Sequence, residues 1–267
     1  MKKLTILAAA LLFAGAANAQ VASSNIGSAP GANALFLPTG QVAIDGFTRN
    51  ISDIQQVGSN QYSVVTQTGN QALTGLQNVA SLKQIAPSAS TGFNNASQTQ
   101  TNTLNSPGSA ATANRMEGEQ RGVRSTMSQT QVGHGNKASG FQTATSSFNL
   151  MTQSQTGVDN QAYSEQRGSL SRSAQTQDGN RNRGVVIQTS PASNNLAIQG
   201  QTGDDNRAYA GQGTQGGGIG IWGTGYNHSN QMQMGNNNYS RTDQFGSDDR
   251  STVSQTGNNN AATVNQH

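Results

Sequence analysis

From Ser125 onward, residue types that suit an interior alternate with residue types that suit a surface, so that each kind recurs at every second position. In the first segment of this kind, one face carries Ser125, Met127, Gln129 and Gln131, and then, after a short interruption, Asn136, Ala138, Gly140 and Gln142. A period of two places alternate side chains on the same face of a β-strand. Recurrent Gly, Asn and Ser and the lack of an apolar stripe with a period of 3.6 disfavour helices. The pattern therefore predicts units of strand, turn and strand.

The units repeat with a fixed internal spacing. Six pairs of glutamines lie eleven residues apart: Gln131 and Gln142, Gln155 and Gln166, Gln177 and Gln188, Gln201 and Gln212, Gln233 and Gln244, and Gln255 and Gln266. Each first glutamine is followed by a glycine two positions later and an asparagine five positions later: Gly133 and Asn136, Gly157 and Asn160, Gly179 and Asn182, Gly203 and Asn206, Gly235 and Asn238, and Gly257 and Asn260. Tandem repeats of this length are typical of solenoids.

Stacking of the units would bring equivalent side chains into columns. A lone pair of strands is at best marginally stable in water, whereas units stacked at the strand spacing of about 4.8 Å can pair every backbone amide with the next unit. A primary amide donates and accepts hydrogen bonds, so the columns of Gln and Asn can satisfy themselves. The glycines suit tight turns. Small or apolar residues should fill the interior between the columns: Met127, Met151, Ala197, Val186, Ala210 and Val264. We therefore predict an all-β solenoid of stacked, cross-β units with an irregular N-terminal region.

Composition narrows the possible functions. Only 32% of the residues are hydrophobic and 10% are charged, the net charge is +3, and cysteine is absent. Ordinary domains are about 45–50% apolar and about 25% charged. The three histidines are dispersed, and neither a carboxylate pair nor an activated nucleophile stands out, so we expect no enzyme activity and no cofactor. The scattered arginines form no basic stripe, so we expect no nucleic-acid partner. Asp204 with Asp205, or Asp248 with Asp249, could hold a metal, but such pairs are usually hydrated turns, and we predict no metal site.

The chain divides into four regions by pattern. Residues 1–19 have the basic start, apolar stretch and small-residue cleavage pattern of a secretory signal peptide. Residues 20–49 form an N-terminal segment, residues 50–124 contain degenerate repeats and linkers, and residues 125–266 contain the six repeats with a Gly-rich insert at 213–225. In the degenerate region, Gln56 and Gln67 keep the spacing of one weak unit. No later segment is apolar enough to cross a bilayer, which predicts an exported mature chain without a transmembrane segment.

The repeat resembles a known family. Ser125, Gln131, Gly133, Asn136, Ala138 and Gln142 match the curlin repeat, SxxxxxQxGxxNxAxxxQ, at every position. The opening serine is replaced by Asn149, Asn195, Asn227 and Asp249 in other units. The resemblance to the subunits of curli, a bacterial functional amyloid, implies an extracellular fibre at the cell surface that serves adhesion and biofilm formation. It also implies export through an outer-membrane channel and nucleated assembly, with this chain as either major subunit or nucleator and with itself or a second curlin subunit as partner.

Two features bear on self-assembly. The last unit ends at Gln266, so the sequence predicts an open strand edge that templates another molecule. Charged residues gather in turns and at outward positions, where they either slow premature assembly or simply form a solvated surface: Asp159, Asp178, Arg181, Arg183, Asp204, Asp205, Arg207, Asp248 and Asp249. Residues 20–49 could engage the export channel or cap the stack.

The alternative is a monomeric secreted solenoid that binds a ligand on a flat face, such as a carbohydrate-binding adhesin or an ice-binding protein. Such a face requires regular outward ladders. One predicted outward column varies from unit to unit and favours self-assembly instead: Lys137, Gln161, Arg183, Arg207, Tyr239 and Ala261.

Overall fold

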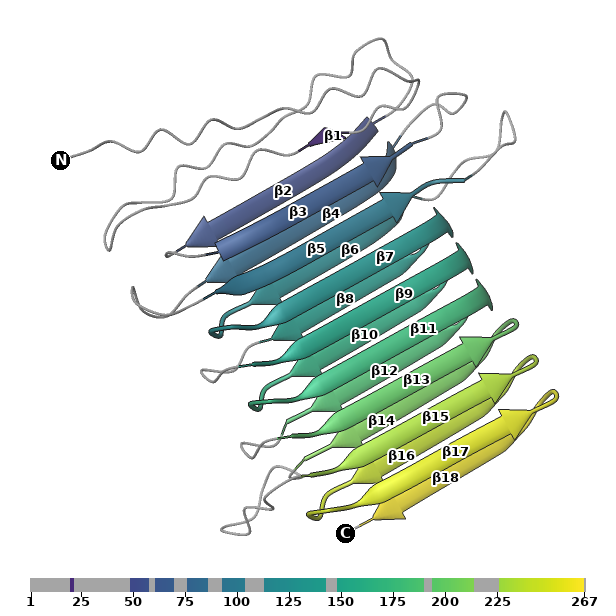
Figure 1. Cartoon of the computed structure of the whole chain (residues 1–267). Helices are drawn as coiled ribbons and strands as arrows, with labels where there is room; N and C mark the ends of the chain where they lie inside the picture. Colours follow the sequence, from purple (N-terminus) through teal and green to yellow (C-terminus); the bar gives the residue numbers. More distant parts are fainter. Residues whose placement is uncertain are drawn as a thin grey trace.

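The computed structural model describes residues 20–21, 49–57, 61–69, 76–85, 93–103, 113–142, 148–189, 194–213 and 226–266. These residues form two nine-stranded sheets that lie face to face (Figure 1). The first sheet contains β1 (Gln20–Val21), β3 (Gln61–Thr68), β5 (Asn94–Thr101), β7 (Thr126–His134), β9 (Leu150–Val158), β11 (Arg172–Asn180), β13 (Leu196–Thr202), β15 (His228–Met234) and β17 (Arg250–Thr256). The second contains β2 (Arg49–Val57), β4 (Leu76–Ile85), β6 (Asn114–Gln120), β8 (Lys137–Gln142), β10 (Gln161–Gln166), β12 (Arg183–Gln188), β14 (Arg207–Gln212), β16 (Tyr239–Gln244) and β18 (Ala261–Gln266). The all-β solenoid prediction is confirmed.

The chain alternates between the sheets, and each strand pairs with the strand two places further along the chain. The pair of β1 with β3 is antiparallel, and every other pair is parallel. The two strands of one unit therefore do not pair with each other, and they meet only through their inward side chains. We call one strand of each sheet, joined by a turn, a rung. The repeat length sets the register: Gln131 lies beside Gln155, and Gln142 lies beside Gln166.

The N-terminal strands continue the stack with longer connections. Gln84, Gln100 and Gln120 lie in the same columns as the glutamines of the regular repeats. The expectation that Gln56 plays the part of a first glutamine is wrong. Gln56 lies beside Gln84 in the second sheet, whose column holds the second glutamine of each unit, and Gln67 belongs to the first sheet. The spacing of eleven recurs here because only three residues separate β2 from β3, although at this point the chain passes from the second sheet to the first.

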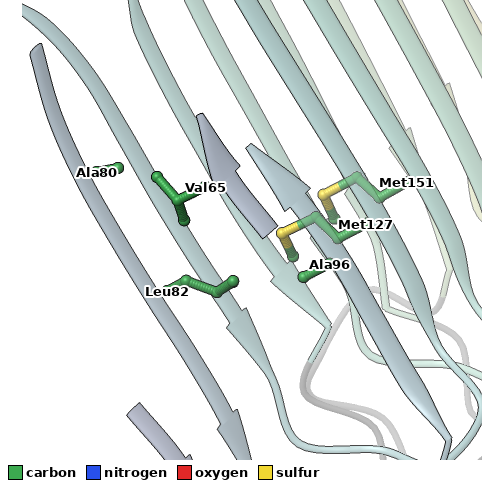
Figure 2. Packing of buried hydrophobic residues seen from close by; sticks show 6 residues of the cluster. All are labelled: Val65, Ala80, Leu82, Ala96, Met127 and Met151. Carbon is green, nitrogen blue, oxygen red and sulfur yellow. The ribbon is translucent and has the colours of Figure 1, made fainter. Parts of the chain in front are cut away.

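Two small apolar clusters lie between the sheets. The larger contains Val65, Ala80, Leu82, Ala96, Met127 and Met151 (Figure 2). Glycines in the facing sheet make room for the methionines, because a Cβ at Gly118 would lie 2.8 Å from the sulfur of Met127 and a Cβ at Gly140 would lie 2.6 Å from that of Met151. The second cluster contains Val186, Ala197 and Ala210. Most of the remaining buried side chains are amides and hydroxyls, so the interior depends on hydrogen bonding rather than on apolar volume.

Several predicted features lie outside the described residues. These are the signal peptide at 1–19, most of the N-terminal segment at 20–49, and the insert at 213–225 apart from Gly213. The described residues contain no helix that is long and apolar enough to cross a membrane.

Candidate assembly site

Two columns of glutamine run the length of the stack, one in each sheet. In the first sheet, hydrogen bonds of 2.7–3.0 Å join Gln67, Gln100, Gln131, Gln155, Gln177, Gln201, Gln233 and Gln255 in succession. In the second sheet, bonds of 2.7–3.0 Å join Gln56, Gln84, Gln120, Gln142, Gln166, Gln188, Gln212, Gln244 and Gln266. In every bond, Nε2 donates to the Oε1 of the next rung. The predicted glutamine columns thus form continuous ladders.

Each ladder amide also holds the two sheets together. The Nε2 of Gln131 donates its second hydrogen to the carbonyl of Arg115 at 3.0 Å, and that of Gln142 donates to the carbonyl of Thr126 at 3.0 Å. These carbonyls belong to the facing sheet. A net contribution of about 0.5–1.5 kcal/mol per hydrogen bond accumulates over the stack, and a buried amide left without its partner costs about 1–3 kcal/mol. The spacing of glutamines therefore specifies both stacking and pairing of the sheets.

A third glutamine ladder was missed by sequence reasoning. Bonds of 2.8–3.0 Å join Gln98, Gln129, Gln153, Gln175, Gln199 and Gln231, which lie two residues before the first-sheet ladder. The signal was present as a repeated Gln-x-Gln motif, whose members share one strand face because of the period of two. Each Nε2 from Gln98 to Gln199 donates to the next amide, and that of Gln231 donates to the hydroxyl of Thr242, whereas Oε1 of Gln98 at the start of the column is buried without a hydrogen-bond partner.

The turns contain an asparagine ladder that runs beside the glycines found two residues after each first glutamine of the repeat. The backbone N–H of Asn160 donates to Oδ1 of Asn136 at 3.0 Å, and Nδ2 of Asn136 donates to the carbonyl of Gly157 at 2.9 Å. The same two bonds recur through Asn182, Asn206 and Asn238, and the backbone bond also reaches Asn260. The asparagines thus bind each turn to the next.

The glycine column is required by backbone geometry and by close stacking. The predicted turn glycines Gly133, Gly157, Gly179, Gly203, Gly235 and Gly257 all have φ between 102° and 123°. This region of φ is strained for residues with a Cβ. In addition, a Cβ at Gly179 would lie 2.1 Å from the carbonyl oxygen of Gly203 in the next rung. No larger side chain fits at this position within the stack.

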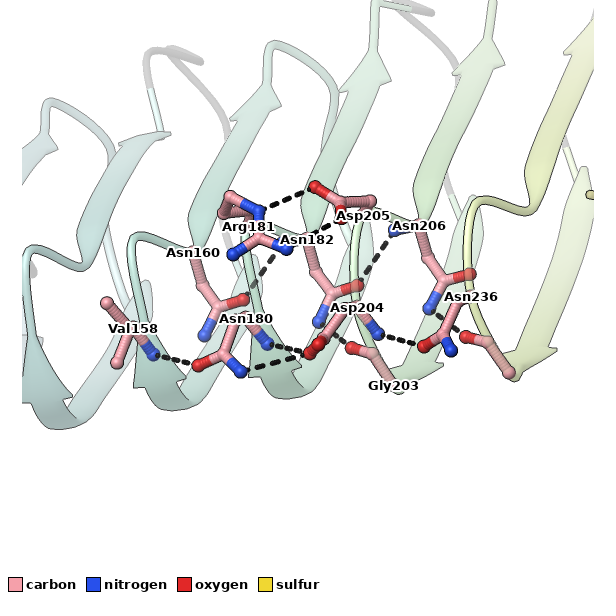
Figure 3. Close-up of polar contacts among 11 residues, drawn as sticks. Val158, Asn160, Asn180, Arg181, Asn182, Gly203, Asp204, Asp205, Asn206 and Asn236 are labelled. Carbon is pink, nitrogen blue, oxygen red and sulfur yellow. Dashed lines mark hydrogen bonds and ion pairs between the residues drawn. The ribbon is translucent and has the colours of Figure 1, made fainter. Parts of the chain in front are cut away.

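Some of the charged turn residues have a structural role (Figure 3). Oδ1 of Asp204 accepts hydrogen bonds from the backbone N–H of Asn180 at 2.8 Å and from its Nδ2 at 3.1 Å. Arg181 forms an exposed ion pair with Asp205 at 2.8 Å. The hydrogen bond from Arg181, together with its charge and that of Arg207, lowers the pKa of Asp205. Asp204 and Asp205 are thus partners of neighbouring rungs, and no cluster of potential metal ligands occurs among the described residues.

The opposite turn uses the positions where asparagine replaces the opening serine of the repeat. The backbone N–H of Ser171 donates to Oδ1 of Asn149 at 3.0 Å, and that of Asn227 donates to Oδ1 of Asn195 at 3.2 Å. Serine has a shorter side chain, and no hydrogen bond to the Oγ of Ser125 is present. The departures from the repeat pattern therefore add contacts between rungs.

The two ends of the stack differ. In the described part of the chain, β17 and β18 pair with a strand on one side only, whereas β1 lies along part of β3 at the other end. The ladders are also directional. Their last amides, at Gln255 and Gln266, donate to carbonyls of the facing sheet but have no further ladder acceptor among the described residues. The C-terminal end therefore presents backbone edges and amide donors.

The fold and the ladders define a parallel β-solenoid whose rungs are joined by side-chain amides. A family model described as the curlin associated repeat matches residues 232–267, in agreement with the resemblance of the repeat to that family. The matched segment includes β16, β17 and β18, whose columns continue through the other units. No curated protein and no solved structure matches the chain.

Proposed function

We propose that this protein is a structural subunit of an extracellular curli-type amyloid fibre that grows by templating at its exposed strand edges. The observation that carries the proposal is the open C-terminal rung. In it, two strand edges have no pairing strand on their outer side, and the last amides of the two ladders have no further ladder acceptor among the described residues. Exposed edges of this kind promote pairing with another chain unless charge, proline or a covering segment protects them.

The composition of the interior supports this proposal. Buried glutamine columns satisfy their hydrogen bonds only when a rung lies on each side, because Nε2 donates forward and Oε1 accepts from behind. Two rungs of different molecules can form the same Nε2 to Oε1 hydrogen bonds as two rungs of one molecule. Each added subunit therefore gains the same interactions that hold the subunit itself together, as in cross-β assemblies.

The cellular setting of the proposal comes from the curlin resemblance and from the signal-peptide pattern at residues 1–19. We propose export through an outer-membrane channel, assembly at the bacterial surface, and a role in adhesion and biofilm matrix. The partners are other copies of this chain or a second curlin subunit, and a nucleator. We propose no enzymatic activity.

The alternative, a monomeric ligand-binding solenoid, has limited support. One outward column of the first sheet carries hydroxyls over five successive strands: Thr66, Thr99, Thr130, Ser154 and Thr176. The column then changes to Gly200 and Met232. The outward column from Lys137 to Ala261 also varies in charge and size. Neither face offers one regular surface along the whole stack.

The proposal is tested by incubating the purified mature chain with thioflavin T and examining it by electron microscopy and fibre diffraction. We expect fibres with a meridional reflection at about 4.8 Å. Protein that remains monomeric and does not bind the dye after correct export would overturn the proposal and would favour the ligand-binding solenoid.

The terminal amides provide a sharper test. We expect Gln255→Ala and Gln266→Ala to slow seeded elongation, because they remove the donors at the templating edge. Matched changes at outward positions within residues 68–113, Ser81→Ala and Thr99→Ala, should leave the rate nearly unchanged. Elongation rates measured with preformed seeds compare the two sets, and equal rates would contradict edge templating.

A further inference from the structure

Along the axis of the stack, strands of the two sheets follow one another in chain order. Each ladder amide donates to a carbonyl of the strand just before its own in the chain: Gln142 of β8 donates to β7 at 3.0 Å, and Gln155 of β9 donates to β8 at 3.0 Å. The same contact occurs at the C-terminal end, where Gln266 of β18 donates to β17 at 3.0 Å. A strand of one sheet therefore lies between two strands of the other.

This order sets a condition on any contact between two copies. The last strand, β18, belongs to the second sheet, so the strand that follows it must belong to the first sheet. In a second copy stacked on this end, β2 belongs to the second sheet, and the parallel strands of the first sheet begin only with β3. Without β1 the first sheet has eight strands in each copy, whereas the second sheet has nine. One strand position of the first sheet must therefore be filled at the joint.

The strand β1 lies at this position. Both β2 and β18 are terminal strands of the second sheet, but the inward residues Asn50 and Gln56 of β2 are only 6% and 4% exposed, whereas Val264 and Gln266 of β18 remain partly exposed. At the N-terminal end β1 extends the first sheet beyond β3, and no described strand extends it beyond β17 at the C-terminal end. One end thus carries the first-sheet strand that the other end lacks.

We infer, on the basis of the proposed self-assembly, that β1 is the joining strand between subunits. In the fibre it lies between β3 of its own copy and β17 of the neighbouring copy, while β18 of that neighbour pairs with β2. Each copy then contributes nine strands to each sheet, and the two sheets continue to alternate across the joint without a gap. The partner is a second copy of this chain, bound through contact of its C-terminal end with the N-terminal end.

The backbone of β1 is oriented for this role. The carbonyl of Thr68 accepts a hydrogen bond from the residue directly after β5, so Thr66 also faces β5, whereas Gln67 faces β1. In an antiparallel pair, opposed residues either face each other or both face away. Gln20 is opposite Gln67 and therefore directs its backbone groups toward β3. Val21 is opposite Thr66 and therefore directs its N–H and carbonyl toward the open side.

The open edge of β17 offers matching groups. The carbonyl of Asp249 accepts from β15 at 2.8 Å and the N–H of Gly257 donates to β15 at 2.9 Å, so the odd-numbered residues of β17 face β15. Ser254 therefore faces the outer side. Ser254 also lies in the same column as Thr66, the residue opposite Val21. Across the joint, Val21 and Ser254 would face each other and exchange backbone hydrogen bonds.

The second sheet is completed at the same joint. Oε1 of Gln56 is buried and has no hydrogen-bond partner. Nε2 of Gln266 donates to the carbonyl of Arg250 at 3.0 Å, and its second hydrogen has no partner among the described residues. Gln56 and Gln266 belong to one column, so pairing of β18 with β2 would extend the ladder from one copy to the next. Contact between two C-terminal ends would instead bring donors against donors.

Disulfide formation tests the joint directly, because the chain contains no cysteine. Asp53 and Thr263 are exposed members of one outward column of the second sheet. Across the joint they would lie on adjacent strands about 4.8 Å apart, a separation that a disulfide can span. A mixture of the single variants Asp53→Cys and Thr263→Cys, assembled and then oxidised, should therefore yield mixed dimers.

The matched control pair lies in the first sheet. Val64 and Thr252 belong to one outward column, but β1 would separate them by two strand spacings across the joint. The mixture of Val64→Cys and Thr252→Cys should therefore yield no mixed dimers. Dimers from this pair would show that β17 pairs directly with β3 and would overturn the role of β1. Fibres in which Asp53→Cys and Thr263→Cys do not cross-link would overturn the joint as a whole.

The outward-facing N–H of Val21 provides a second test. Val21→Pro removes this donor, while Gln20 keeps the groups that face β3 and stays in the extended region that proline favours for its predecessor. We expect seeded elongation to slow about fivefold or more. The matched variant Val21→Ala keeps the N–H and should elongate at nearly the unmodified rate. Faster elongation of the proline variant would mean that β1 must leave before another copy binds, and an unchanged rate would mean that β1 makes no contact there. Either result would contradict a joining strand.

The outcomes separate this inference from the proposed function. Fibres that form with the other pattern of cross-links, or that grow without regard to the N–H of Val21, would remove the joining strand and leave the proposed function standing. Absence of fibres from the unmodified chain would overturn the proposed function itself.

Discussion

The strands β2–β6 and the regular repeats from β7 to β18 belong to the same stack but are built differently. Both share the outer glutamine ladders. They differ in the interior, where β3–β5 contribute Val65, Leu82 and Ala96 to the larger apolar cluster. Among the described residues, the column of glycines at positive φ begins at Gly133. The outer glutamine ladders are therefore the feature that both regions share.

The largest expected difference concerns the glycine column. We expect Gly179→Ala to prevent orderly stacking, because its Cβ would lie 2.1 Å from a backbone oxygen and the residue has a φ of 123°. Gly118→Ala should cost only about 1–3 kcal/mol, because its Cβ meets the flexible side chain of Met127. Thioflavin T kinetics and infrared spectra of the β-sheet compare the variants. Normal assembly of Gly179→Ala would show that the turns can be rebuilt.

The ladders should respond alike in both regions. Gln155→Leu would leave a donor of Gln131 and an acceptor of Gln177 unpaired, and Gln84→Leu would do the same to Gln56 and Gln120. Each change should therefore cost about 2–6 kcal/mol. Guanidinium titration of assembled fibres measures the loss. A change that is severe in one region and harmless in the other would contradict a common ladder.

The apolar interior should matter mainly in the N-terminal region. Leu82 is 1% exposed in the larger cluster, and we expect Leu82→Ala to cost about 2–5 kcal/mol. Val186→Ala in the smaller cluster removes less volume and should cost less. The same guanidinium titration checks this prediction, and an equal loss for the two variants would show that the ladders dominate everywhere.

The smallest expected effect is that of acid on the ion pair in the turns. The pKa of Asp205 is lower in the fold than in an unfolded chain, chiefly because of the hydrogen bond from Arg181. Its stabilising contribution is therefore present above the unfolded pKa and is lost as the pH falls through the folded pKa. Because the pair is exposed, the effect should be small and reduced by salt. Denaturation midpoints from pH 7 to pH 3 should fall slightly less for Asp205→Asn than for the unmodified chain.

Sequence reasoning found the features that repeat at constant offsets and missed those that do not. The outer ladders from Gln131 and the turn asparagines follow a fixed spacing, so one repeat reveals the others. In the N-terminal region, Gln67 and Gln84 lie in consecutive strands, as do Gln100 and Gln120, but at longer and unequal separations. A search at one offset cannot align them, because connection length varies freely while the columns stay in register. The ladder from Gln98 to Gln231 was missed for another reason: its members have no glutamine eleven residues later, so a search for pairs at that spacing passes over them.

The uniform direction of the ladder bonds has an electrical consequence. Each amide along the columns from Gln56 to Gln266 and from Gln67 to Gln255 points its N–H toward the C-terminal end. Their dipoles add rather than cancel, as peptide dipoles do along a helix axis. A long filament built this way would be polarised from tip to tip, so two neighbouring filaments would attract each other most strongly when they run in opposite directions.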